Sequence, residues 1–322
     1  MIKRVLLACL SAGGILCFAA AAHAQEFPAR PLRMIVPFPP GGSNDIVGRM
    51  VANQLGERLG QAVVVDNRAG AGGTIGTEAA AKAAPDGYTL LLISVAHAFN
   101  PAVYKRLGYD PEKSFAPIGM VGTGPVALCV NPALPVASVK ELIALAKARP
   151  GQLNYATAGV GSFQHLASEL FRLQAGVDMV HVPYKGGGPA LMDTIAGQAQ
   201  INLASFIQVL PHIRSGKLKL LATSGTRRSA VMPEVPTIAE TVPGYEATNW
   251  WGVVAPAGTP QPLLAKLHGA LQQVVDSAET KKRLEGEGAD VLRMSAAEFG
   301  AFIGAEIAKW SRVVKQAGIT AE

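Results

Sequence analysis

Residues 32–59 read LRMIVPFPPGGSNDIVGRMVANQLGERL, an apolar run, a loop rich in glycine and proline, and a helical segment in direct succession. The run Leu32 to Val36 predicts a buried strand, and residues 46–59 predict a helix. Short apolar runs alternate with Ala-rich helical stretches along the rest of the chain. This alternation indicates a parallel sheet with helical crossovers, so we expect an α/β fold.

The other expected elements follow the same pattern. Strands are expected at residues 32–38, 62–66, 89–95, 126–130, 154–158, 179–184, 201–206, 218–224 and 250–255. Ser138 with Glu141 and Ser295 with Glu298 form capping boxes, which mark the starts of two helices. Gly/Pro-bearing stretches near residues 119–125 and 243–248 are candidate crossings between two domains.

Composition excludes several classes of protein. The chain has 322 residues, of which 49% are apolar and 16% charged, so it can build a core. The formal charge of +6 is small and is not clustered among aromatic residues, which argues against a nucleic-acid partner.

Residues 1–24 have the pattern of a secretory signal peptide. Lys3 and Arg4 precede an apolar stretch that ends in Ala22-His23-Ala24, so we expect cleavage after Ala24 and a periplasmic location. Lipidation at Cys9 is the lesser alternative, because only one turn of apolar chain precedes it. Cys129 is then the sole thiol, and we expect it to be buried in a strand and unpaired.

The first glycine-rich loop, PFPPGGSND at residues 37–45, predicts an anion cradle. Gly41 and Gly42 let a ligand approach the main chain, and the first helical turn points free N–H groups outward. We expect ligand contact from Phe38 and Ser43 as well. Asp45 is also a candidate contact, although a helix-start role is the preferred interpretation.

A second cradle is expected in YATAGVGSFQH at residues 155–165, where a strand runs into a glycine-rich loop and a helix. Thr157 and Ser162 offer hydroxyls, and Gly159 and Gly161 leave room for a ligand. A capping role alone for Ser162 is an equal alternative. The segment GAGGTIG at residues 70–76 fits a packing turn better than a dinucleotide fingerprint, whose spacing it lacks.

Catalytic and metal-binding motifs are missing from the sequence. There is no GxSxG elbow, HExxH motif or Walker loop, so we expect neither an enzyme nor a metal site nor a cofactor. Among the histidines, His97 is the one expected to face a cleft, because it follows a strand end. Trp250 and Trp251 are interpreted as packing residues.

Four ordered motifs carry a family resemblance. They are PFPPGGSND (37–45), PDGYTLL (85–91), YATAGVGSFQHLA (155–167) and HVPYKGGGPALMD (181–193). Over essentially the whole mature chain, the sequence resembles the Bug-type solute receptors of tripartite tricarboxylate transporters. The resemblance implies a two-domain periplasmic binding protein-like (type II) fold with two hinge crossings and a ligand cleft between the domains. It also implies that residues 38–45 and 157–162 grip a carboxylate.

Domain bounds and selectivity positions follow from this resemblance. The first domain is expected at residues 25–124 plus 248–322, and the second at 125–247. Selectivity is expected at residues 94–97, 184–187 and 205–208, which adds four candidate ligand contacts: Ser94, His97, Tyr184 and Ser205. The resemblance leaves open whether Lys185 contacts the ligand.

The expected function is that of a monomeric, non-catalytic receptor. It would close around a small organic acid, acidic amino acid or aromatic acid and deliver it to membrane permease subunits. Two alternatives remain open: a sensor subunit that presents the same ligand to a membrane kinase, and an enzyme on the same fold that uses Ser162 and His165.

Overall fold

The computed structural model describes residues 27–225, 227–229, 232–286 and 288–320. The predicted signal peptide, residues 1–24, lies outside these ranges. Within them, no helix combines the length and the apolar character that a bilayer crossing requires.

All nine expected strands are present. They are β1 (Leu32–Val36), β2 (Val63–Asn67), β3 (Thr89–Ser94), β4 (Phe115–Val130), β5 (Asn154–Thr157), β6 (Val180–Pro183), β7 (Ile201–Ser205), β8 (Lys219–Thr223) and β9 (Thr248–Pro256). A tenth strand, β10 (Asp290–Val291), was not expected, and β4 begins eleven residues earlier than the sequence pattern indicates. The α/β class is confirmed.

Helices follow most of the strands. They are α2 (Ser43–Leu59), α3 (Thr74–Ala81), α4 (Val95–Val103), α5 (Val139–Ala148), α6 (Phe163–Ala175), α7 (Gly187–Ile195), α8 (Phe206–Arg214), α9 (Gln261–Asp276), α10 (Ala278–Gly286) and α11 (Ala296–Ala317), with 3-10 turns η1 (Ala71–Gly73) and η2 (Ile238–Glu240). Ser138 and Ser295 cap α5 and α11 through their hydroxyls, as the capping boxes predict.

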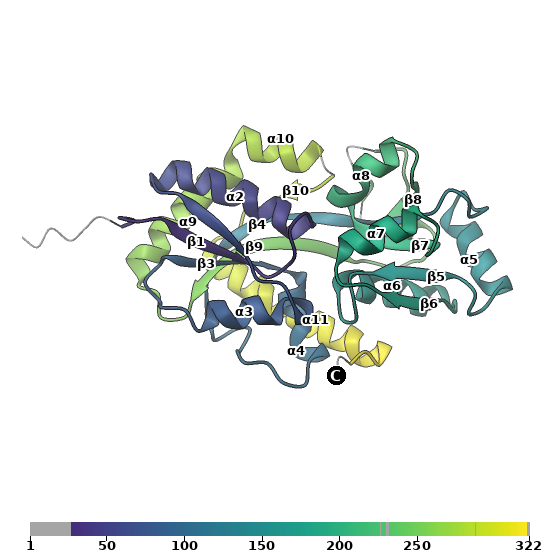
Figure 1. Cartoon of the computed structure of the whole chain (residues 1–322), viewed down its shortest axis with the longest axis horizontal. Coiled ribbons are helices and arrows are strands. Elements are labelled where there is room, and N and C mark those ends of the chain that lie inside the picture. Colours follow the sequence, from purple (N-terminus) through teal and green to yellow (C-terminus); the bar gives the residue numbers. More distant parts are fainter. Residues whose placement is uncertain (1–26, 226, 230–231, 287, 321–322) are drawn as a thin grey trace, which may run out of the picture.

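The strands form two parallel groups joined by antiparallel strands. The order is β2-β1-β3-β9-β4-β7-β5-β6, with β8 and β10 also paired to β4. Strands β1, β2 and β3 are parallel and make the first group, and β5, β6 and β7 are parallel and make the second. Figure 1 shows the first group on the left and the second on the right, with β4 and β9 running between them.

Strand β4 changes its partner midway. It pairs with β9 as far as Pro125↔Thr248, and its pairing with β7 begins at Val126↔Ser205. The chain thus leaves the first group and enters the second along one continuous strand. Ligands of open α/β sheets bind beyond the carboxyl ends of the parallel strands, so the loops at those ends are the ones that matter for function.

The two adjacent tryptophans of β9 serve packing, as expected. Trp250 is 2% and Trp251 0% exposed. The Trp250 indole donates to Glu306 of α11 at 2.9 Å, and the Trp251 indole donates to Asn44 of α2 at 2.9 Å. Since successive residues of a strand point to opposite faces, this pair fastens β9 to a helix on each side. Cys129 of β4 is fully buried, which raises the pKa of its thiol and confirms the expected unreactive position.

Candidate functional site

In the described part of the chain, four α-helices that come directly after a parallel strand begin without a side-chain cap. They are α2, α4, α7 and α8, whose N-cap residues are Gly42, Ser94, Gly186 and Ser205. These helices follow β1, β3, β6 and β7, two strands from each group. The first N–H groups of a helix have no partner inside the helix, so an uncapped start leaves them for solvent or a ligand.

The β1–α2 loop, residues 37–42, is held in shape by Asp45. One oxygen of the Asp45 carboxylate accepts from the Gly41 N–H at 2.9 Å and from Arg49 Nε at 3.0 Å, and the other accepts from Asn67 Nδ2 at 2.8 Å. Burial raises the pKa of Asp45, but these hydrogen bonds outweigh it, and the pKa lies below the usual value. The carboxylate is fully occupied, so Asp45 supports the loop, in line with the preferred interpretation.

Residues 70–76 pack behind this loop. A Cβ on Gly73 would lie 3.1 Å from the Phe38 ring, and one on Gly76 would lie 2.6 Å from the Arg68 carbonyl. The packing-turn interpretation of this segment is confirmed, and the half-buried Phe38 braces the loop from below. Gly42 has room by comparison, because a Cβ there would meet only the Pro39 carbonyl at 3.8 Å.

The β5–α6 loop, residues 158–162, is ordered by its own side chains. The Ser162 hydroxyl accepts from the His165 N–H at 3.3 Å and so caps α6, and His165 Nδ1 accepts from the Gly161 N–H at 3.1 Å. Thr157 is fully buried, and its Oγ1 lies 2.6 Å from His181 Nε2 and accepts from the Gly159 N–H at 3.2 Å. The Thr157 and Ser162 hydroxyls, which were expected to hold the ligand, therefore already have hydrogen-bond partners in the protein.

A column of stacked rings lies beneath this loop. The His165 and His181 rings stack with centroids 3.9 Å apart, and the Tyr155 ring stacks on His181 at 5.1 Å. Burial, together with the neighbouring His165, lowers the pKa of His181 to about 4, and burial lowers that of His165 as well. Both rings are therefore neutral near pH 7, so they supply packing and hydrogen bonds without charge.

Ser94 and Ser205 keep free hydroxyls at the ends of β3 and β7. The two residues are only 4% and 5% exposed, yet neither hydroxyl caps its helix, and neither bonds to another described residue. Neither oxygen is among the described buried side-chain atoms that lack a partner, so both hydroxyls can be reached by water or a ligand. These two hydroxyls are more available to a ligand than those of Thr157 and Ser162.

The side chains of His97 and Tyr184 are packed among protein neighbours. His97 is 3% exposed, its Nε2 is 2.7 Å from the Pro111 carbonyl, and its ring packs against Tyr109 and Phe115. Burial lowers the pKa of His97 to about 4. The Tyr184 ring packs against the buried cluster of Ala156, Ala190 and Ala199, and burial together with the neighbouring Asp193 raises the pKa of Tyr184. These contacts give both side chains a structural role, and we leave them out of the proposed ligand contacts.

Contacts between the two parts of the chain bring the loops together. A Cβ on Gly186, in the β6–α7 loop (residues 184–186), would lie 3.6 Å from Pro39 Cγ in the β1–α2 loop. A Cβ on Gly161 would lie 2.5 Å from Cγ1 of Val103 in α4. The β1–α2 loop of the first group thus borders the start of α7, and the β5–α6 loop borders the end of α4.

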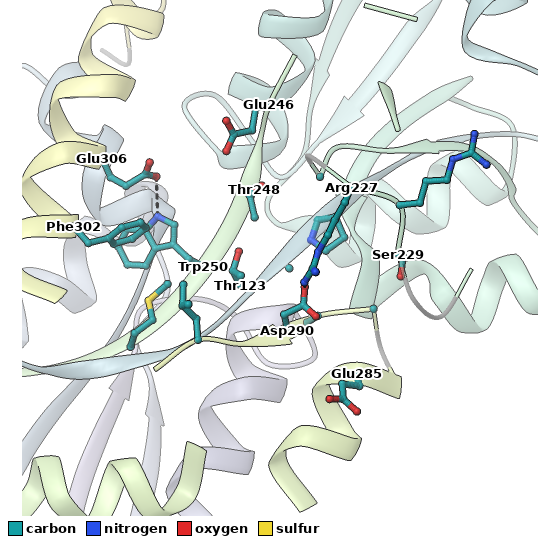
Figure 2. A pocket seen from close by; sticks show the side chains of 18 of the residues that line it. Thr123, Arg227, Ser229, Glu246, Thr248, Trp250, Glu285, Asp290, Phe302 and Glu306 are labelled. Atoms are coloured by element: carbon teal, nitrogen blue, oxygen red, sulfur yellow. Dashed lines mark hydrogen bonds and ion pairs between the residues drawn. The ribbon is translucent and has the colours of Figure 1, made fainter. Parts of the chain in front are cut away.

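A cavity of about 830 Å³ lies elsewhere, along β10 and the segment that follows β8. Figure 2 shows Thr123, Thr248 and Trp250 on its wall, and Arg227 reaching Asp290. The Arg227 guanidinium and the Asp290 carboxylate pair at 3.3 Å, but both are exposed, and such pairs stabilise little. None of the expected ligand contacts lines this cavity, which is therefore distinct from the candidate site.

Within the described ranges, no three metal-ligating side chains gather in one place. The Ser162 hydroxyl accepts a hydrogen bond from the main-chain N–H of His165, and the His165 ring nitrogen Nδ1 accepts one from the Gly161 N–H. This arrangement lacks the contact between ring nitrogen and hydroxyl that an activated serine requires.

Comparisons with known proteins point to one family. Residues 47–319 match the family described as "Tripartite tricarboxylate transporter family receptor". "Protein BugT" of Bordetella pertussis is 42% identical over 303 residues, covering 93% of each chain. The structure "R. palustris Rpa4515 with adipate" aligns with a TM-score of 0.89 at 36% identity, covering 92% of this chain and 100% of that one. The periplasmic binding protein BugD aligns with a TM-score of 0.87 at 35% identity, covering 92% and 100%.

Proposed function

Because the chain belongs to the tripartite tricarboxylate transporter receptor family, a family of solute-binding receptors and not of enzymes, we propose that it captures a small carboxylate between its two strand groups. The observation that supports this most is the set of four uncapped helix starts, two from each group, with the free Ser94 and Ser205 hydroxyls among them. One relative is described with bound adipate.

We assign the binding role chiefly to main-chain N–H groups. In the β1–α2 loop they are those of the first turn of α2, from Ser43 onward, because Asp45 already occupies the N–H of Gly41. In the second group they are the first N–H groups of α7 and α8, supplemented by Ser205. Phe38, Thr157, Gly159, Gly161 and Ser162 shape the two loops.

The energetics allow binding without an arginine. Hydrogen bonds to a charged group contribute about 1.5 to 3 kcal/mol each. Four or five of them on one carboxylate can reach micromolar affinity, about 8 kcal/mol, after the cost of association is subtracted.

The domain division is part of the proposal. We place the first domain at residues 25–124 plus 248–322 and the second at 125–247, with closure about the β4 and β9 crossings. The change of partner on β4, from Thr248 opposite Pro125 to Ser205 opposite Val126, supports these bounds.

The setting of the receptor is also proposed. We infer export with cleavage after Ala24, a periplasmic monomer, and delivery of the acid to the permease subunits of a tripartite tricarboxylate transporter. The family description and the periplasmic relative support this setting.

Native mass spectrometry of the protein purified from the periplasm tests the proposal. The expected result is a co-purified carboxylic acid that is lost on unfolding. Recovery of a bound ligand that has no acid group would contradict it.

A further inference from the structure

Two glutamine side chains from separate helices meet at Gly187, the first residue of α7. A Cβ on Gly187 would lie 2.9 Å from Gln208 Oε1 and 3.0 Å from Gln164 Nε2. Gln164 is the second residue of α6 and Gln208 the third of α8. The absence of a side chain at Gly187 therefore leaves a gap into which both amides reach.

Neither amide has a hydrogen-bond partner among the residues that the structure describes. Both glutamines are partly buried, and neither side chain hydrogen-bonds to any residue in the described ranges. Gln54 and Gln272 differ, because their amides donate to Thr280 and to the Met294 carbonyl. A partly buried amide offers two N–H donors and one acceptor, so a pair of unengaged amides is a ready contact for a polar group.

The gap lies beside the proposed ligand site. Gln164 follows Ser162 by two residues. Gly186, next to Gly187, faces the β1–α2 loop, because a Cβ on Gly186 would lie 3.6 Å from Pro39 Cγ. A ligand whose first carboxylate sits at the start of α2 would thus extend toward the two amides.

We propose that Gln164 and Gln208 hold the second acid group of the ligand, so that the receptor selects diacids over monoacids of equal length. This inference rests on the proposed function and names its substrate class. The amides supply N–H donors to the second carboxylate, and Gly187 keeps the space between them open.

The isosteric changes Gln164→Glu and Gln208→Glu test the assignment. Each change places a negative charge in the first turn of a helix, where the charge interacts favourably with the helix dipole, so we expect the variants to fold. The same charge repels a second carboxylate. Gln198→Glu, at an exposed turn of the same part of the chain, is the matched control.

The measurement is calorimetry on the full mature chain with the straight-chain diacids from succinate to suberate, each paired with its monoamide. We expect the best diacid to bind the wild type at least tenfold tighter than its monoamide. In Gln164→Glu and Gln208→Glu the diacid should lose at least tenfold in affinity while the monoamide loses less than threefold, and Gln198→Glu should change neither. Gly187→Ala, which adds no charge, should weaken the diacid by displacing both amides.

Two outcomes overturn the inference. One is a wild type that binds the monoamide as tightly as the diacid, and the other is an unchanged diacid-to-monoamide ratio in both glutamate variants. If no carboxylate in the series binds the wild type, and the native protein carries no acid, the failure belongs to the proposed function itself.

Discussion

Gly161 in the β5–α6 loop lies directly against Val103 at the end of α4, because a Cβ on Gly161 would come within 2.5 Å of Val103 Cγ1. The two residues belong to the two parts of the chain that we propose to close on the ligand. Gly161 also has φ +72°, a conformation that side chains other than glycine disfavour. The close approach of the loops therefore depends on the missing Cβ.

Gly161→Ala should weaken both folding and binding. The left-handed conformation costs about 1–2 kcal/mol for alanine, and the added methyl group collides with Val103. We expect the free energy of unfolding to fall by about that amount, and the affinity for the co-purified acid by about tenfold or more. Adding Val103→Ala should restore affinity but not stability, which calorimetry and urea unfolding measure separately. Equal affinity in the single variant and the wild type would refute the contact's role.

Gly42→Val should separate binding from folding. Gly42 has φ −82° and an open surrounding, so a side chain can be placed there, and the less favourable N-cap should lower stability by only about 1 kcal/mol. The side chain would stand in front of the first N–H groups of α2 and block the ligand. Gly269→Val, at an exposed position of α9 with open space around it, is the control. Retained affinity in Gly42→Val would remove the start of α2 from the site.

Asp45→Asn should loosen the β1–α2 loop. The amide cannot accept all three hydrogen bonds from Gly41, Arg49 and Asn67, so at least one hydrogen bond to the charged carboxylate is lost. The expected loss of stability is about 1–3 kcal/mol, with weaker binding as a consequence. Urea unfolding at pH 7 checks the first effect and calorimetry the second. A variant as stable as the wild type would show that this network does not hold the loop.

His97 should make the protein sensitive to acid. Its pKa is about 4 in the folded chain, below its ordinary value, because burial disfavours the charged ring. Between about pH 6.5 and pH 4, His97 is protonated in the unfolded chain and neutral in the folded chain. The free energy of unfolding therefore falls as the pH falls through this window. The loss for one such group is about 3 kcal/mol in total. His97→Gln should lessen the slope of unfolding free energy between pH 6.5 and 4.5, and an unchanged slope would argue against this assignment.

The fold could be predicted where strands are apolar and uninterrupted. Strands such as β3 (Thr89–Ser94) and β7 (Ile201–Ser205) are short buried runs, and they were expected within one residue of their bounds. The first part of β4 was missed because Pro117, Gly119, Gly122 and Pro125 interrupt it, and these residues normally break strands. This segment is nevertheless a strand, because it pairs with β9 along its length. Strand β10 has only two residues, which is too short for a strand pattern in the sequence.

The loops of the site could be predicted because their glycines are local signals. The hydrogen-bond partners of the loop residues could not be predicted, because they come together only when distant parts of the chain fold. The occupation of the Gly41 N–H by Asp45 and the engagement of Thr157 with His181 are tertiary contacts. The meeting of Gln164 and Gln208 joins residues 44 positions apart, which no spacing rule connects.

The most direct test of the account is a crystal structure of the protein with its co-purified acid. The account predicts a carboxylate oxygen about 3 Å from main-chain N–H groups in the first turn of α2, with the rest of the ligand extending toward α7 and α8. An acid bound in the cavity beside Trp250, or paired to an arginine away from both loops, would contradict it.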